Sequence, residues 1–304
     1  MTVFCVLAHG DPTTFNHLAH RMTPATMVVH VDAKSSLDGY VESPAIHYVG
    51  DRVRVSWAGF SQVEATMRVY EAALKLVRDE SEHIVLLSGQ CIPLRPLVDL
   101  EDFLAKSPWN QHCKAGLLLD GRQRNEDRVR KTWRFDQFDA RARPPMRQFN
   151  AAARRLITMS RGSIPLDAFD GLTVAAGSNW TALTAACVDD ILARSDLVER
   201  CTSLFRNALG PDEIFFHTLV HSTKWGQDTA TPDPAPKGDR RTADFANLHY
   251  IYRSLTKFIA VEDLPQLRES SAYFSRKADL RANPELAGAF SCLDVPGDSS
   301  AEFE

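Results

Sequence analysis

The sequence lacks the features that mark several large classes of protein. None of its apolar runs approaches the length of a membrane span, and no basic stretch followed by an apolar one opens the chain as in a secretory signal peptide. The glycine patterns GxGxxG and GxxxxGK[ST] are also absent, which leaves a dinucleotide fingerprint and a P-loop unsupported. We therefore expect a cytoplasmic protein, or one whose targeting segment lies outside this sequence.

Cysteine pairs are another absence. The chain has six cysteines, and no two of them form a CxxC pair: Cys5, Cys91, Cys113, Cys187, Cys201 and Cys292. Their spacing does not fit a zinc site, and several lie inside apolar segments. We predict reduced thiols with structural roles and no bound metal.

Charge is unevenly distributed along the chain. The formal net charge is −4, yet the segment from Arg122 to Arg161 holds 12 Lys/Arg against four Asp/Glu, a local balance of +8, so the remainder totals −12. Such a segment is either a salt-bridged surface or a face for an anionic partner such as a phosphate donor, an acidic glycan or a lipid surface. Nucleic acid is not expected, because no helix-turn-helix, RRM or zinc-finger signature is present.

Buried strands alternate with helices in the first third of the chain. Apolar runs predict strands at 2–8, 27–32 and 83–88, and short strands at 45–48 and 52–55. Ser61 and Glu64 form a capping-box pattern before a helix to about residue 78. This alternation indicates an α/β fold with a mostly parallel, doubly wound sheet. Ligands bind beyond the carboxyl ends of such strands, which selects His9, Asp32 and Ser88-Gly89.

Three segments of the second half carry candidate chemistry. Gly210-Pro211-Asp212-Glu213 places two carboxylates in the first turn of a predicted helix over 212–222. Gly177-Ser178-Asn179-Trp180 precedes a predicted helix over 181–194 and suits either sugar stacking or core packing. Arg276-Lys277 follows an aromatic pair and is either a surface pair or a diphosphate site.

Taken together, these segments resemble the core-2/I-branching β-1,6-N-acetylglucosaminyltransferase family (glycosyltransferase family 14), which includes the peptide O-xylosyltransferases and many bacterial members. The matching stretches occur in the family's order: VLAHGDP (6–12), VHVDAKS (29–35), VSWAGFSQVEATM (55–67), LLSGQCIPL (86–94), GSNWTALT (177–184), GPDEIFFHTLV (210–220), NLHYI (247–251) and YFSRKAD (273–279). The resemblance implies a single GT-A-type nucleotide-sugar domain over 1–290, with an acidic tail at 291–304.

The resemblance also implies a reaction. A UDP-sugar, with GlcNAc or xylose expected, would pass its sugar with inversion to a hydroxyl of a glycan or glycolipid acceptor. No metal cofactor is expected, because Arg276 and Lys277 would replace an Asp-x-Asp-bound ion and no Asp-x-Asp occurs here. Glu213 would be the general base. The implied donor-binding residues are Val6, His9, Asp32, Ser88, Gly89, Ser178, Trp180, Arg276 and Lys277.

One position departs from the family pattern. Cys91 stands where relatives usually have an acid, and a thiol is a poor substitute for a carboxylate acceptor. The donor sugar therefore stays open, and so does a non-catalytic homologue that binds a UDP-sugar or a glycan. The basic segment is assigned to acceptor recognition through Arg130 and Trp133, together with Tyr250. A bacterial surface-glycan or glycolipid pathway fits a cytoplasmic protein, and peripheral association with a membrane stays open.

Overall fold

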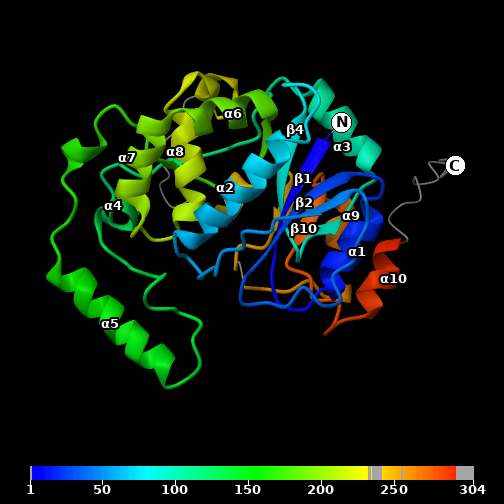
Figure 1. Ribbon diagram of the computed structural model, residues 1–304, viewed down its shortest axis with the longest axis horizontal. Coiled ribbons are helices and arrows are strands. Elements are labelled where there is room, and N and C mark those ends of the chain that lie inside the picture. Colours follow the sequence, from blue (N-terminus) through cyan, green and yellow to red (C-terminus); the bar gives the residue numbers. More distant parts are fainter. Residues whose placement is uncertain (1, 232–233, 235–241, 255, 292–304) are drawn as a thin grey trace, which may run out of the picture.

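The computed structural model describes residues 2–231, 234, 242–254 and 256–291. A five-stranded sheet in the order β3-β2-β1-β4-β8 forms its centre (Figure 1). Its strands are β1 (Thr2–Ala8), β2 (Thr26–Val31), β3 (Ile46–Tyr48), β4 (His83–Ser88) and β8 (Ala182–Thr184). The first four pair in parallel, and β8 runs antiparallel to β4. The predicted α/β class with a mostly parallel sheet is confirmed, and it agrees with a GT-A-type fold.

Helices cover both faces of this sheet. Side chains alternate along β1, so that Val3 and Cys5 join one buried cluster while Phe4 and Val6 join the other. The first face carries α2 (Ser61–Leu74), α6 (Ala185–Ala193), α7 (Ser195–Phe205) and α8 (Phe215–His221), and the second carries α1 (Thr13–Arg21) and α3 (Leu97–Lys106). Among the described residues, no helix is both long enough and apolar enough to cross a bilayer.

The strand order reverses at β1. The chain proceeds from β1 to β2 and β3 on one side, and β4 then pairs with β1 on the other. The ends of β1 and β4 lie close, since Gly89 N donates to Leu7 O at 2.9 Å and a Cβ at Gly89 would lie 2.9 Å from the Cβ of Ala8. A switch point of this kind is where open α/β sheets bind ligands.

A second, three-stranded sheet brings the C-terminal third of the chain to this edge. It has the order β5-β10-β9, with β5 (Ile92–Pro93), β9 (His249–Ile251) and β10 (Phe274–Arg276). The helices α9 (Leu264–Glu269) and α10 (Glu285–Ser291) pack with it in a small apolar cluster. The predicted boundary at residue 290 falls inside α10, and residues 292–304, including Cys292, lie outside the described residues.

The basic segment forms two helices, α4 (Gln123–Arg130) and α5 (Met146–Ser160), which the sequence analysis did not identify. Two short strands flank this segment in the chain and pair with each other: β6 (Gly116–Leu117) precedes it and β7 (Ala175–Ala176) follows it. In Figure 1, α5 stands apart from the rest of the fold.

Two element predictions are wrong. Residues 52–55 form no strand, because their amides bind side chains instead: Val53 N donates to His30 Nε2 at 2.8 Å, and Val55 N donates to Asp32 Oδ1 at 3.3 Å. The helix predicted over 181–194 begins only at Ala185, since residues 182–184 pair with β4 as an edge strand.

The predicted capping box of α2 is also wrong. The carboxylate of Asp136, 75 residues away, takes the place of the Ser61 cap. It accepts from Phe60 N at 2.7 Å and from the Ser61 hydroxyl at 2.5 Å. Gly59 is needed for this approach, because a Cβ there would clash with the Asp136 carboxylate. The first turn of α2 is therefore attached to the basic segment, which contains Asp136.

Replacing Asp136 with Ala is expected to lower the free energy of unfolding by about 1–2 kcal/mol, because it leaves the first amides of α2 without their acceptor. Urea unfolding of Asp136→Ala measures the change, with exposed Gln137→Ala as the matched control. An unchanged midpoint in both variants would show that water replaces this cap without loss.

Candidate active site

Glu213 ends the short turn Pro211–Glu213 that leads into α8. Gly210 makes this turn possible, because its φ of 65° is one that other residues rarely adopt. The Glu213 carboxylate meets Arg128 of α4, with Oε2 2.8 Å from Nη2. Both side chains are mostly buried, at 23% and 15% exposure, so the pair fixes the direction of the carboxylate.

Asp212 is held beside it by two amides rather than acting as a helix cap. Its Oδ2 accepts from Gln62 Nε2 at 3.1 Å and from Asn179 Nδ2 at 3.2 Å, and no side chain caps the turn. Burial, and next the adjacent Glu213 charge, raise the pKa of Asp212 to about 7. The sequence analysis placed Asp212 in the first turn of a helix; in the structure its carboxylate is bound by side chains of α2 and of the Gly177–Trp180 segment and does not cap that turn. Like charges held together in this way are typical of functional sites.

The Gly177–Trp180 segment passes directly over this pair. Gly177 N donates to the backbone oxygen of Glu213 at 3.0 Å, and a side chain at 177 would clash with Lys114 O and His217. Ser178 is only 1% exposed, and its hydroxyl has no hydrogen-bond partner among the residues described. A buried hydroxyl without a partner costs free energy unless a ligand or water satisfies it.

Trp180 serves as a platform for a cation. The indole is 6% exposed, and the guanidinium carbon of Arg276 lies 4.5 Å from its ring centroid. Asn247 fixes the backbone below by donating to Trp180 O at 3.2 Å. The sequence analysis left core packing and sugar stacking open for Trp180. In the structure Trp180 belongs to the buried apolar cluster on the first face of the sheet, and its ring also contacts Arg276.

Arg276 and Lys277 place two positive charges next to each other at this site. Arg276 Nε is buried and has no hydrogen-bond partner in the part of the chain that the structure describes. Burial lowers the pKa of Arg276, opposed by Cys91, Asp212 and Glu213. Burial, then Arg276 and Arg141, lowers the pKa of Lys277 to about 8. Two neighbouring cations that have lost part of their hydration favour the binding of an anion.

Arg141 adds a third cation from the basic segment. Its charge acts on His9, Arg276 and Lys277, lowering the pKa of each. Its guanidinium carbon lies 5.6 Å from the ring centroid of Trp57, which is itself 47% exposed. Trp57 therefore does not belong to the core; it supports this arginine.

The ends of β1 and β2 supply the next side chains. Asp32 is 6% exposed; its Oδ1 accepts from Lys34 N at 2.9 Å and from Val55 N, while Oδ2 lies 3.5 Å from Lys34 Nζ. His9 stays exposed, although desolvation lowers its pKa against the opposing charge of Asp32. Val6 is fully buried between β2 and β4, and its predicted donor contact stays a prediction.

Cys91 closes the floor at the end of β4. Its thiol is fully buried, accepts from Ser88 N at 3.2 Å and lies 3.3 Å from His249 Nε2. Burial raises the pKa of Cys91 to about 11 and lowers that of His249 to about 3. A neutral pair thus stands where relatives are expected to carry an acid. All five cysteines that the structure describes are buried and free.

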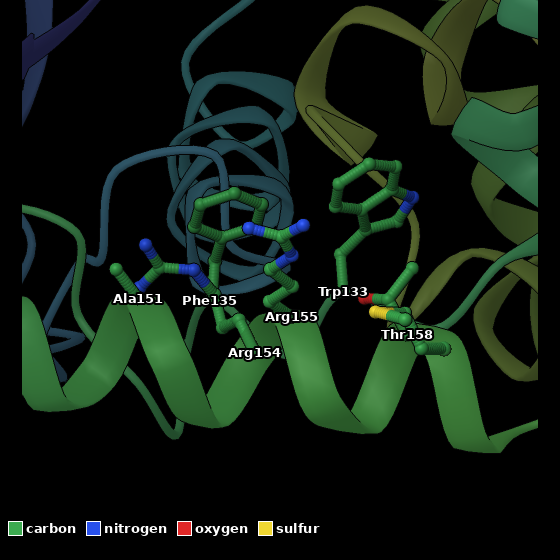
Figure 2. A pocket seen from close by; sticks show the side chains of 7 residues that line it. Trp133, Phe135, Ala151, Arg154, Arg155 and Thr158 are labelled. Atoms are coloured by element: carbon green, nitrogen blue, oxygen red, sulfur yellow. The ribbon is translucent and has the colours of Figure 1, made fainter.

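The predicted acceptor residues are dispersed. Arg130 is engaged in structure, donating to Ile164 O at 2.9 Å and pairing with Glu126 at 2.7 Å. Trp133 lines a cavity of about 400 Å³ with Phe135, Arg154, Arg155 and other residues of α5 (Figure 2). Tyr250 lies in β9 and packs against the C-terminal cluster. Their acceptor roles stay predictions.

Sequence reasoning did not single out Arg128, Arg141, Gln62 or Asn179. Gln62 and Asn179 lie inside two of the matched stretches, which was the available signal, whereas the two arginines were hidden in the basic segment. No group of three His, Cys, Asp or Glu side chains is arranged to hold a metal ion within the described ranges.

Comparison with known proteins gives one family and a set of distant relatives. A family model described as Core-2/I-Branching enzyme matches residues 2–233. Xylosyltransferase 2 of Rattus norvegicus is 26% identical over 204 residues, which are 64% of this chain and 21% of that protein. Xylosyltransferase oxt of Drosophila melanogaster is 25% identical over 205 residues, with the same shares. The chain spans about a fifth of the length of these curated relatives.

Proposed function

Because the chain belongs to the Core-2/I-Branching enzyme family, we propose that it is a glycosyltransferase that moves a sugar from a UDP-sugar to an acceptor hydroxyl, with inversion and without a metal. One observation carries the proposal. The Glu213 carboxylate lies in the same site as Arg276, and two buried polar atoms there, Arg276 Nε and Ser178 Oγ, lack partners among the described residues. A base and an anion-binding group in one site are what this displacement requires.

Glu213 would remove the proton from the acceptor hydroxyl. The hydroxyl oxygen then forms a bond to the anomeric carbon, while the bond from that carbon to the diphosphate breaks and its electron pair leaves with UDP. Arg128 would be a positioning residue, because it holds the carboxylate from 2.8 Å and acts on the reaction through Glu213. Because the carboxylate is already held in one direction, less conformational entropy is lost when the reacting groups reach the geometry for transfer.

The leaving diphosphate gains negative charge during this step. Arg276 can present a planar fork and Lys277 a point charge, and Arg141 strengthens the field from the opposite segment. Preorganised charges in a water-poor site stabilise such a transition state strongly. The same neighbourhood favours a nucleoside at the ends of β1 and β2, where Asp32 Oδ2 accepts no backbone amide from the residues that the structure describes.

Donor binding and metal dependence test the proposal together. Thermal unfolding in EDTA should be shifted upward by UDP, UDP-GlcNAc or UDP-xylose, with about 2.7 kcal/mol of stabilisation at a hundredfold excess over Kd. ADP and GDP serve as matched controls. UDP release in the presence of a panel of glycan and glycolipid acceptors then reports transfer. Transfer that is lost in EDTA and restored by Mn²⁺ contradicts the metal-free mechanism.

UDP affinity is expected to fall as pH rises from 7 to 8.5. Lys277 has its pKa lowered to about 8, and a bound diphosphate favours the protonated form, so binding weakens as the free amine loses its proton. The expected change in Kd is about three- to fourfold. Titration calorimetry of the protein and of Lys277→Arg measures it. The arginine variant should give a flat profile over this range, and an equal slope in both would assign the pH dependence to another group.

The second candidate function is a non-catalytic homologue that binds UDP-sugars or glycans, favoured by the neutral Cys91 and His249 pair. It predicts UDP-dependent stabilisation with neither hydrolysis nor transfer for any donor. Cys91→Asp, which places an acid near Arg276, would then be the variant in which turnover first appears.

A further inference from the structure

Helix α5 contacts the body of the protein through polar side chains and exposes apolar ones to solvent, which is the reverse of the usual arrangement. Three polar side chains spaced four residues apart attach it to the body: Asn150 donates to Asp139 O at 2.9 Å, Arg154 to Phe138 O, and Thr158 to Thr132 O at 2.8 Å. Arg154 also lies 4.8 Å from the ring centroid of Phe135. Figure 2 shows this face of α5 turned toward Trp133 and Phe135.

Several large apolar side chains of α5 are exposed to solvent instead of being packed in the core. Met146 is 54% exposed, Phe149 64% and Leu156 68%, and Met159, which also lines the cavity beside Trp133, is 73% exposed. Phe149 and Leu156 are seven residues apart and therefore lie within about 20° of each other on the helix. Contiguous exposed apolar side chains of this size usually mark an interaction surface.

The charge around this face is of one sign. Residues 140–166 contain six arginines, no lysine and no Asp or Glu. Arg143, Arg147, Arg155 and Arg161 are exposed along or next to α5. A second copy of the chain would set like charges against each other here, which disfavours self-association. A surface that offers both anionic groups and an apolar interior matches the face instead.

From this complementarity we propose that α5 docks on an anionic lipid surface, with Phe149 and Leu156 inserted below the headgroups and the arginines bound to phosphates. The inserted side chains supply buried apolar area, and each arginine near an anionic surface adds attraction that salt weakens. Since Arg141 belongs to the same basic segment as α5 and its charge acts on Lys277, docking would hold the active site close to the lipid surface. An acceptor carried on a lipid is a consequence that rests on the proposed function; docking itself does not.

Flotation of the full chain with vesicles tests the proposal. Vesicles of phosphatidylcholine with phosphatidylglycerol should carry the protein, while pure phosphatidylcholine vesicles should carry at least about tenfold less, as should the mixed vesicles at high salt. The pair Phe149→Ser and Leu156→Ser is expected to lower binding by at least about tenfold. The pair Arg143→Gln and Arg147→Gln should do so by about tenfold or more.

The controls use side chains of equal exposure elsewhere. Val98→Ser removes a 62% exposed apolar side chain from α3, and Arg268→Gln removes an exposed charge from α9. Both should bind vesicles normally. UDP binding should be unchanged in all variants, which shows that they fold and separates a failure here from a failure of the proposed function. Equal vesicle binding by the α5 variants and the controls overturns the proposal. A chain that binds no vesicles also overturns the proposal. If Phe149→Ser then alters a monomer–dimer equilibrium in sedimentation, the exposed face of α5 is an interface between two copies of the chain.

Discussion

Glu213→Gln is expected to lower kcat for sugar transfer by about 10²- to 10⁴-fold and to change the Kd for UDP less than about threefold. Glutamine keeps the size of the side chain and an oxygen that can accept from Arg128, but it cannot take a proton from the acceptor hydroxyl. Steady-state turnover and calorimetric UDP binding measure the two halves. Near-normal turnover would remove Glu213 from the role of base.

Asp212→Asn is the matched control for this variant. Its carbonyl oxygen can still accept from Gln62 and Asn179, and it removes the same formal charge one residue away. We expect its kcat to stay within about tenfold of the wild-type value, because the acid in question is not the base. A larger loss for Asp212→Asn than for Glu213→Gln would exchange the roles of the two carboxyl groups. That result would be compatible with the raised pKa of Asp212, so the comparison decides between them.

The sheet and the family were accessible from sequence because both depend on local signals. Residues 2–8 and 83–88 are short apolar runs bounded by turn residues, and both form strands with the predicted bounds. The matched stretches likewise keep their order along the chain, and the predicted family is confirmed. Strand ends then selected His9, Asp32 and Ser88 by a rule about sheets, without any knowledge of side-chain contacts.

The remaining features depend on contacts between distant residues. Asp136 displaces Ser61 from its expected capping role because it reaches α2 from 75 residues away. Arg128 meets Glu213 across 85 residues, and nothing in the local sequence marks it among twelve basic residues. Helix α5 was not predicted from the sequence. Its large apolar side chains are exposed, so the place of this helix in the fold does not follow from packing in the core. The local sequence patterns therefore identified where the site lies in the fold. Contacts between distant residues determine how its side chains are oriented, and these contacts cannot be read from local sequence.

Arg276→Met is expected to cause the second large loss, about 10²- to 10³-fold in kcat/KM, with UDP binding weakened as well. In the wild-type protein the Arg276 guanidinium carbon lies 4.5 Å from the centroid of the Trp180 ring. Methionine keeps an apolar side chain against this ring, so the substitution changes the packing less than the charge. Arg276→Lys should recover part of the loss, because it restores the charge without the planar fork. Arg281→Met is the matched control, since this residue makes a surface pair with Asp11 and is 75% exposed. If Arg276→Met turned over UDP-sugar as the control does, Lys277 and Arg141 alone would neutralise the leaving group. Arg276 Nε, which has no partner among the described residues, would then need another explanation.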